Sequence, residues 1–189
     1  MNILILSGAT RSCSYSTMIA NRLKEIFSGL DADATLTFID NRDLQLPTYD
    51  DYDHLTPEHR KTIHYVSEHL YAADALILVS PEYNGGMAGG LKNTLDFFRK
   101  EYEWKPMGLV SVTSGTLGGQ NAMNQLAAFA SYVGACLSPT RLMVSQVQHV
   151  FENPDGEEAK RFEKNAEKFC SDLILFTSMI KNGLLNYSH

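Results

Sequence analysis

The chain has 189 residues, of which 44% are hydrophobic and 20% are charged. This composition is that of an ordinary globular protein and excludes a disordered or low-complexity chain. Sixteen Lys and Arg against twenty-two Asp and Glu give a net charge of −6, so we expect no nucleic-acid partner. No stretch approaches the roughly 18 apolar residues of a membrane-spanning helix, and we expect a cytoplasmic protein with no membrane partner.

The length is that of one domain, and the sequence contains no internal repeat, linker or change of composition. We therefore expect a single domain over residues 1–189. The three cysteines, Cys13, Cys136 and Cys170, are odd in number and form no Cys-x-x-Cys motif. This pattern disfavours a disulfide framework and a zinc site, and it is typical of a reducing compartment.

The first strand is expected at residues 2–7, where a short apolar run opens the chain. A polar loop follows, and apolar residues then recur with helical spacing: Ile19, Leu23, Ile26 and Leu30. The second strand is expected at residues 35–39, and an irregular acidic segment follows over residues 40–55. Thr56 before Pro57 then predicts the N-terminus of a second helix.

Four histidines recur every five residues in and before this second helix: His54, His59, His64 and His69. Five residues advance a helix by about 140° beyond a full turn, so these side chains spread around the helix. We expect them to face solvent and not to bind a metal.

The third strand is expected at residues 75–80, an unbroken apolar run that is typical of a strand buried on both faces. A glycine-rich loop and a helix follow, and the helix carries Leu91, Leu95 and Phe98 on one face. The remaining expected elements are a strand at 107–113, a helix around 123–130, a strand at 142–144 and a long helix after Gly156. Such alternation predicts an α/β protein, in either a flavodoxin-like or a truncated dinucleotide-binding strand order.

The loop after the first strand, from Ser7 to Thr17, is rich in hydroxyl side chains and enters a helix. Backbone amides at a helix N-terminus bind anions, and Arg11 can add a charge-assisted contact, so we predict a site for a phosphomonoester. The alternative is that the hydroxyls only cap the helix. The loop lacks the Lys of a nucleotide-triphosphate P-loop, and Cys13 follows Arg11 instead of preceding it as in a cysteine phosphatase. Cys13 is either an oxidation-sensitive thiol or a small filler.

Two further loops follow strands at the same edge of the sheet, where ligands of α/β proteins bind. In residues 80–90, glycines permit close approach of a flat ligand and Tyr83 can lie against an aromatic ring; the alternative is a plain turn with a surface tyrosine. In residues 113–119, small residues again join a strand to a helix and predict a second backbone wall for the same ligand.

Three segments together resemble the NAD(P)H-dependent FMN reductase family. Its first motif, Gly-Ser-x-Arg-x-x-Ser-x-Asn, appears as residues 8–16 with departures at Ala9 and Ser16. Its most specific motif is matched nearly letter for letter by residues 81–85, continued by Gly90-Leu91-Lys92-Asn93 and Asp96. Residues 114–119 are similar to its third flavin loop, although Asn121 replaces the Arg that commonly follows.

The resemblance implies a flavodoxin-like three-layer sandwich with a five-stranded parallel sheet and FMN as cofactor. It implies an oxidoreductase that moves hydride from NADPH or NADH to flavin N5, and then reduces a quinone, azo, metal-oxyanion or flavin acceptor by a ping-pong mechanism. We expect no catalytic side chain, because the flavin carries the chemistry, and we assign Glu82 to binding. The expected cofactor-binding residues are Arg11, Ser14, Tyr15, Ser16, Pro81, Glu82, Tyr83, Asn84, Gly85, Ser114, Gly115, Thr116, Gly118 and Gly119. The alternatives are a non-enzymatic flavodoxin-type electron carrier or FMN-binding module, and a flavin-free interaction protein.

The resemblance also implies a homodimer or homotetramer with the flavin near a subunit boundary. The segment after Gly90 carries more large apolar groups than one buried stripe requires, and we expect an interface there: Leu91, Leu95, Phe97, Phe98, Tyr102 and Trp104. Tyr49 and Tyr52 are expected to reach toward the neighbouring subunit's site. The alternative is ordinary packing within one chain.

Overall fold

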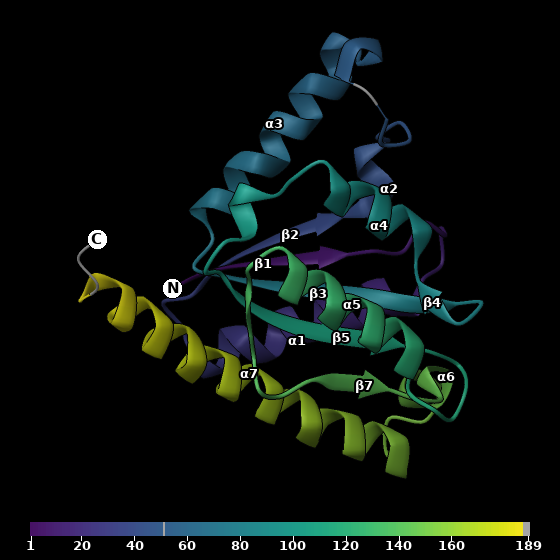
Figure 1. Ribbon diagram of the computed structural model, residues 1–189. Helices are drawn as coiled ribbons and strands as arrows, with labels where there is room; N and C mark the ends of the chain where they lie inside the picture. The colour runs from purple at the N-terminus through teal and green to yellow at the C-terminus, as the bar shows by residue number, and fades with distance from the viewer. Residues whose placement is uncertain (51, 187–189) are drawn as a thin grey trace.

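A parallel sheet organises the computed structural model of the chain, which describes residues 1–50 and 52–186 (Figure 1). Its central strands lie in the order β2-β1-β3-β5, and short strands β6 and β7 both pair with β5. Their bounds are β1 (Asn2–Ser7), β2 (Thr35–Asp40), β3 (Ala75–Tyr83), β5 (Pro106–Val112), β6 (Cys136–Leu137) and β7 (Leu142–Val144). Counted in the order in which the sequence predicts them, β5 is the fourth strand and β7 the fifth. The sheet then has the strand order 2-1-3-4-5, which confirms the flavodoxin-like alternative.

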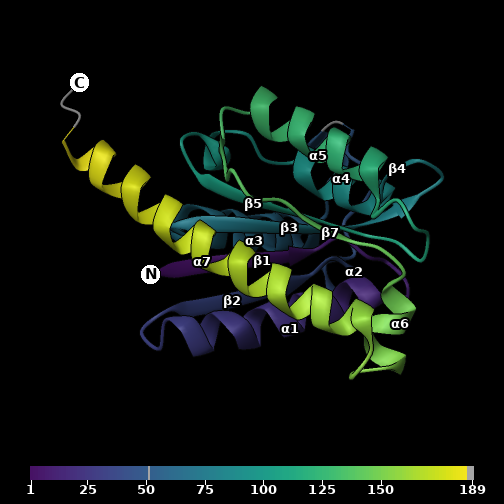
Figure 2. The same ribbon diagram turned by 90° about the horizontal axis from the view of Figure 1, so that it is seen from below.

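Helices cover both faces of this sheet, because side chains of each strand alternate between two cores. Ile3 and Ile5 of β1 belong to one core, and Leu4 and Leu6 belong to the other. Figure 2 shows α1 (Tyr15–Leu30) and α7 (Glu157–Leu185) on one side of the sheet, with α4 (Gly89–Asp96) and α5 (Gln120–Tyr132) on the other. Helix α3 (Pro57–Ala72) packs on the same core as α4 and α5. The three-layer prediction is therefore confirmed.

Two helix N-termini carry side-chain caps: the one predicted at Thr56, and one in the first loop, where capping was the alternative interpretation. The Ser14 hydroxyl accepts a hydrogen bond from Ser16 N at the start of α1 (3.2 Å). At the start of α3, Thr56 Oγ1 accepts from His59 N (3.1 Å), and His59 Nδ1 accepts from Thr56 N (3.4 Å). His59 is therefore half-buried as a cap, and His69 is half-buried against Tyr65. The prediction that all four histidines face solvent was wrong for these two.

Short elements also form where the sequence predicted none. Helix α2 (Asn41–Leu44) and a 3₁₀ turn (Tyr52–His54) lie in the segment expected to be irregular, and α6 (Val147–Glu152) follows β7. Strand β3 runs three residues beyond the predicted end at residue 80 and pairs antiparallel with β4 (Gly86–Met87). This extension carries part of the site described below.

The large apolar groups after Gly90 are buried within the chain itself. Leu91, Leu95 and Tyr102 are fully buried, and Phe97 and Phe98 are 8% and 5% exposed. The helix ends at Asp96, and the following turn brings these rings into the core under α3 and α5. This burial favours the alternative of ordinary packing within one chain, and the expected interface at these residues stays a prediction; of that set, Trp104 alone is exposed (60%). The side chain of Tyr52 lies outside what the structure describes.

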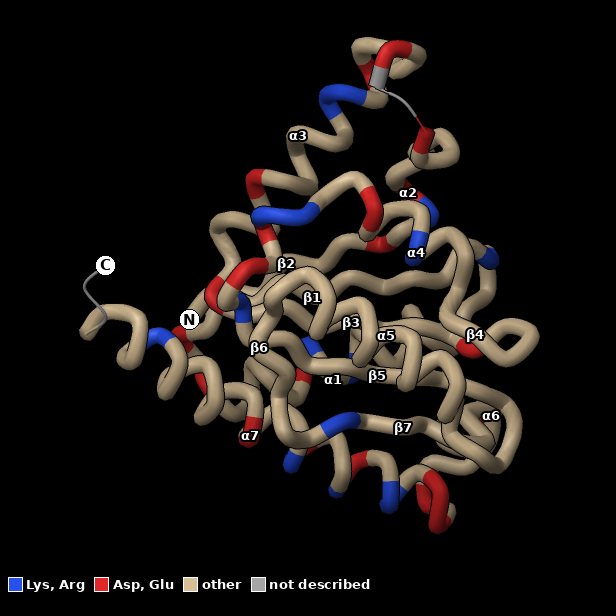
Figure 3. Tube along the Cα trace, in the orientation of Figure 1, with Lys and Arg blue, Asp and Glu red and all other residues tan. Residues whose placement is uncertain are grey.

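The parallel strands bring the loops after β1, β3 and β5 to one edge of the sheet, where α2, β4 and α6 also lie (Figure 1). Acidic and basic residues are mixed along α3 and α7, whereas α5 carries no charged residue (Figure 3). Among residues 1–50 and 52–186, every helix is too short or too polar to cross a membrane.

Candidate functional site

Three direct contacts bring the predicted loops together at this edge. The Arg11 guanidinium of the first loop lies over the ring of Tyr83 in the second, 4.7 Å from its centroid. The Glu82 carboxylate accepts hydrogen bonds from the backbone N–H groups of Asn121 (2.9 Å) and Ala122 (3.0 Å), which follow the third loop. The sequence prediction that these segments form a single site is consistent with this geometry.

The first loop is packed closely against its neighbours. A Cβ added at Gly8 would lie 2.6 Å from Leu91 Cβ in α4, and one added at Gly90 would lie 2.5 Å from Thr10 Cγ2. The Gly8 N–H also donates to the Val79 carbonyl of β3 (2.8 Å). The loop is thus held between α4 and the sheet by contacts that no larger residue permits.

The backbone N–H groups of residues 9–15 make no hydrogen bond to any part of the chain that the structure describes. They lie before α1 and at its first residue, Tyr15, and the first turn of α1 contains no acidic residue. Arg11 is exposed, and its side chain forms no ion pair with a described residue. Unpaired amides at a helix N-terminus, beside a guanidinium that has no ion pair with a described residue, are the groups that bind anions, so the residues present fit the phosphate of FMN.

Three predicted contact residues in this loop already have partners within the chain. The Ser14 hydroxyl caps α1, and Ser16 is only 1% exposed. The Tyr15 ring stacks on Phe151 of α6, with centroids 6.0 Å apart. The alternative that the hydroxyls cap the helix therefore describes Ser14 correctly, and the amides and Arg11 remain available for a ligand.

The second loop is a tight β-hairpin and not an irregular glycine-rich loop. Asn84 and Gly85 both have positive φ (49° and 75°), as the two central residues of a type I′ turn require. Tyr83 pairs with Gly86 on either side of the turn. Asn-Gly is the sequence that favours this turn most strongly, so the amino-acid sequence contains enough information to predict the hairpin. The hairpin projects a rigid backbone ribbon from the edge of the sheet.

Side chains from β3 and α5 fix this hairpin. The Ser80 hydroxyl accepts from Ala88 N (3.1 Å), and the Gln125 side chain accepts from Met87 N (2.9 Å). Glu82 adds its two bonds to the N-terminus of α5, where Gly119 offers no side-chain cap. Glu82 therefore supplies from another strand the capping oxygen that α5 lacks, and it ties the hairpin to the third loop. Pro81 is buried behind it.

The third loop is shaped by two glycines with positive φ, Gly118 (64°) and Gly119 (76°). A Cβ at Gly119 would lie 2.9 Å from Ser111 Cβ, and the Ser111 hydroxyl donates to the Gly118 carbonyl (2.6 Å). The opposite side of the loop is bound to the segment before α6, since Gln146 N donates to the Gly115 carbonyl (2.9 Å). The predicted contact residues Ser114, Gly115 and Thr116 are exposed between these anchors.

The structure also shows site-supporting residues that sequence reasoning missed. Gln125 holds the hairpin, and Asn41 of α2 accepts from Thr94 Oγ1 of α4. Asp40 and Arg42, on either side of Asn41, contact the first loop through the bonds described below. None belongs to the three predicted segments, and each acts through a contact distant in sequence.

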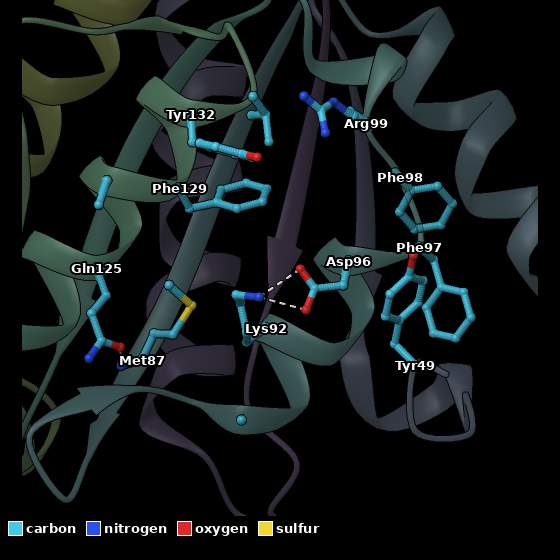
Figure 4. A pocket seen from close by; sticks show the side chains of 13 residues that line it. Tyr49, Met87, Lys92, Asp96, Phe97, Phe98, Arg99, Gln125, Phe129 and Tyr132 are labelled. Carbon is cyan, nitrogen blue, oxygen red and sulfur yellow. Dashed lines mark hydrogen bonds and ion pairs between the residues drawn. The ribbon is translucent and has the colours of Figure 1, made fainter. Parts of the chain in front are cut away.

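A groove of about 840 Å³ lies between α4 and α5, next to the hairpin (Figure 4). Five aromatic side chains contribute to its walls, and Lys92 and Asp96 form an ion pair on α4 (2.6 Å). Tyr49 packs edge-on against Phe97 at one side, and Phe129 and Tyr132 come from α5 on the other. The groove continues from Met87 of the hairpin along the surface of the chain.

Comparisons with known proteins agree with this geometry. Residues 1–149 match the family model described as NADPH-dependent FMN reductase. The chain is 28% identical over 161 residues to the NADPH azoreductase of Bacillus sp. (strain OY1-2), covering 85% of each protein. It is 27% identical over 186 residues to the FMN-dependent NADPH-azoreductase of Staphylococcus aureus (strain USA300), covering 94% of this chain and 96% of that protein.

Among solved structures, an oxidoreductase from Corynebacterium diphtheriae superposes with a TM-score of 0.75 at 16% identity, covering 96% of this chain and 97% of that one. This likeness supports the flavodoxin-like fold. The family match confirms the predicted oxidoreductase class and FMN as its cofactor. The chain belongs to the NADPH-dependent FMN reductase family.

Proposed function

We propose that the protein binds FMN at the meeting point of the three loops and uses it to reduce a small-molecule acceptor with electrons from NADPH or NADH. The observation that carries this proposal is the row of unpaired amides at residues 9–15 beside the Arg11 guanidinium, which contacts the Tyr83 ring and has no ion pair with a described residue. In this proposal the phosphate of FMN binds to these amides, and the flavin ring lies along residues 81–85. Residues 114–119 form the facing wall. Arg11 of the first loop contacts Tyr83 of the hairpin, so the two segments are adjacent. A flavin whose phosphate is bound at the first loop can therefore extend its ring toward the hairpin.

The protein's own part in the reaction is to bind and to orient. When bound, FMN supplies the hydride-transfer chemistry between a nicotinamide and the second substrate. Glu82 is the acidic side chain of the hairpin, and its carboxylate is occupied by the Asn121 and Ala122 amides. It therefore holds two backbone walls in register, and we assign no proton transfer to it.

We further propose a ping-pong order in which the oxidised nicotinamide leaves before the acceptor enters the same open site. The acceptor class is a quinone, azo compound, metal oxyanion or free flavin. The azoreductase names of the two relatives support an azo compound first. The competing function is a flavodoxin-type electron carrier, which shares the fold and the cofactor but does not oxidise nicotinamides directly.

Initial rates over a grid of NADPH and benzoquinone concentrations test this proposal. Parallel double-reciprocal lines are expected for the FMN-loaded protein, and the apoprotein is expected to be inactive. Intersecting lines contradict the ping-pong order. An FMN-loaded protein that leaves NADPH and NADH unoxidised is a carrier. Replacing benzoquinone by an azo dye in the same assay tests the acceptor class.

We also propose that the groove between α4 and α5 is where a second copy of the chain binds, giving a homodimer or a homotetramer. Tyr132 is 75% exposed on this groove, and Arg99 lies over its ring at 5.4 Å. Lys92 and Asp96 offer both charges one turn apart, which suits contact between two identical helices. The groove begins at the hairpin residue Met87, so a partner bound there stands beside the flavin site.

Sedimentation at micromolar concentration tests this assembly, and a monomer contradicts it. Phe98→Glu is unsuitable because Phe98 is buried in the chain's own core. Tyr132→Glu is expected to dissociate the dimer, whereas Tyr71→Glu, at a tyrosine 58% exposed on α3, is the matched control and is expected to leave it intact. Equal behaviour of the two variants places the interface elsewhere.

A further inference from the structure

Arg42 contacts the phosphate loop from outside it. It lies in α2, directly after β2, and its Nη1 donates a hydrogen bond to the Ser12 carbonyl (2.6 Å), with the Arg11 carbonyl at 3.5 Å. About thirty residues of chain separate these partners. The contact joins a guanidinium to backbone oxygens, so it acts on the conformation of the loop and not on one of its side chains.

Asp40 fixes the other side of the same guanidinium. Arg42 Nε donates to Asp40 Oδ1 (2.9 Å) and Nη2 donates to Oδ2 (2.6 Å), a bidentate pair that sets the plane and direction of the guanidinium. The Asp40 side chain is only 3% exposed. Burial alone raises the pKa of Asp40, but the bonds from Arg42 outweigh it and hold this pKa below its ordinary value.

Asp40 is in turn anchored to the elements that flank the loop. Thr17 Oγ1 of α1 donates to Asp40 Oδ2 (3.2 Å), and the Thr17 and Ser7 hydroxyls lie 3.2 Å apart. Ser7 is the last residue of β1, and Thr17 lies in the first turn of α1. The carboxylate therefore joins both ends of the loop, while Arg42 holds its middle.

The peptide geometry gives this contact a consequence for anion binding. In a planar trans peptide the C=O and the following N–H point in opposite directions. Because the Ser12 carbonyl points toward Arg42, the Cys13 N–H points away from Arg42. In the same way, the Arg11 carbonyl points toward Arg42 and the Ser12 N–H points away from it. These two N–H groups lie within the unpaired row at residues 9–15.

Arg42 itself is poorly suited to be the ligand of the phosphate. Two of its nitrogens are bound to Asp40 and a third to the Ser12 carbonyl, and its charge is neutralised by Asp40. Arg11 has no such partner among the described residues. The two arginines therefore have different roles, with Arg11 free to contact an anion and Arg42 holding the backbone that receives it.

We propose that Arg42 and Asp40 are positioning residues for cofactor binding, which hold the peptide units of residues 11–13 with their N–H groups directed at the FMN phosphate. This inference rests on the proposed placement of that phosphate in the first loop. It requires that loss of Arg42 weakens FMN while riboflavin, which has the ring and no phosphate, binds as before.

Titration of the apoprotein with FMN and with riboflavin tests the proposal. The readout is the dissociation constant of FMN divided by that of riboflavin. Arg42→Gln is expected to weaken FMN about tenfold and to leave riboflavin unchanged, since one oriented hydrogen-bonding group is lost. Arg42→Lys keeps the charge without the bidentate geometry, so it is expected to retain part of the FMN affinity that Arg42→Gln loses. Urea unfolding of each apoprotein shows that the variants are folded.

Arg22→Gln is the matched control. Arg22 also forms a bidentate pair, with Glu163 (2.8 Å for both bonds), but it contacts no backbone carbonyl of the loop. Its removal is expected to leave the FMN to riboflavin ratio unchanged. A ratio that is also unchanged in Arg42→Gln overturns the positioning role.

Arg11→Ala separates this failure from failure of the proposed site. If Arg11→Ala raises the ratio of the FMN to the riboflavin dissociation constant and Arg42→Gln does not, the phosphate lies in the first loop and the positioning inference alone is wrong. If neither variant changes the ratio, the phosphate lies elsewhere and both proposals are wrong. A raised ratio in both variants supports both proposals.

Discussion

Glu82 couples the hairpin to helix α5, and its replacement is the most informative single change in the site. Its carboxylate accepts the Asn121 and Ala122 amides at 2.9 and 3.0 Å, in the first turn of a helix whose N-cap is Gly119. A hydrogen bond to a charged group contributes about 1.5–3 kcal/mol. Glu82 is half-buried, so solvent screening places the expected loss in Glu82→Ala near the lower end, at about 1.5–2 kcal/mol.

Glu82→Gln separates the charge from the acceptor oxygen. The amide keeps one oxygen for the α5 amides but no longer complements the helix dipole, so the expected loss is about 0.5–1 kcal/mol. Urea unfolding of the apoprotein measures both losses without any contribution from the flavin, provided that the m-value is unchanged. Glu167→Ala and Glu167→Gln, at an exposed position in α7, are the controls.

The same variants have a second readout in flavin binding. Loss of the Glu82 bridge releases the hairpin from the third loop, which affects the walls around the ring and not the phosphate loop. FMN and riboflavin are therefore expected to weaken together. The reasoning is refuted if Glu82→Ala unfolds at the same urea concentration as the Glu167 controls and binds both flavins as the unchanged protein does.

Three further predictions concern the first loop and its supports. Arg11→Ala is expected to weaken FMN about 10- to 150-fold in a fluorescence titration and to spare riboflavin, because one charge-assisted contact is lost; equal loss for both flavins contradicts a phosphate at Arg11. Gly8→Ala is expected to destabilise the protein by about 1–3 kcal/mol because its Cβ meets Leu91 at 2.6 Å, whereas Gly29→Ala meets nothing within 4 Å and is expected to stabilise it in the same urea assay. Because the pKa of Asp40 is below its ordinary value in the folded state, its contribution is complete above the unfolded pKa of about 3.9 and is lost as pH falls through the folded value. Asp40→Asn is therefore expected to lower the free energy of unfolding at neutral pH. It is also expected to make that free energy fall less steeply below about pH 4, and an unchanged slope there contradicts this.

Local patterns predicted the elements that depend on local chemistry. The apolar run of β1, the capping Ser14 and the pair of Thr56 and Pro57 each specify an element without help from the rest of the chain, and the structure contains all of them. The positions of the three loops followed from strand order, because parallel strands end at one edge. The Asn84-Gly85 hairpin is equally local, and a turn is predicted there only as the alternative to a glycine-rich ligand loop.

The rest depends on contacts between distant segments. Phe97 and Phe98 look like excess apolar surface until the turn after Asp96 brings them under α3 and α5. Glu82 reads as a free charge in a loop until the N-terminus of α5 is placed beside it. Arg42 has no local motif at all, since its role exists only because the end of β2 lies next to the loop after β1. Residues that support a site from neighbouring elements are therefore the part that a sequence pattern predicts least.

The central claim is that the amides of residues 9–15 and the Arg11 side chain receive the cofactor's phosphate. A crystal structure of the protein with FMN tests it most directly. We predict the phosphate within hydrogen-bonding distance of several of these amides and of the Arg11 guanidinium, with the ring beside residues 81–85. A phosphate bound at any other place, with these amides left facing solvent, would contradict the account.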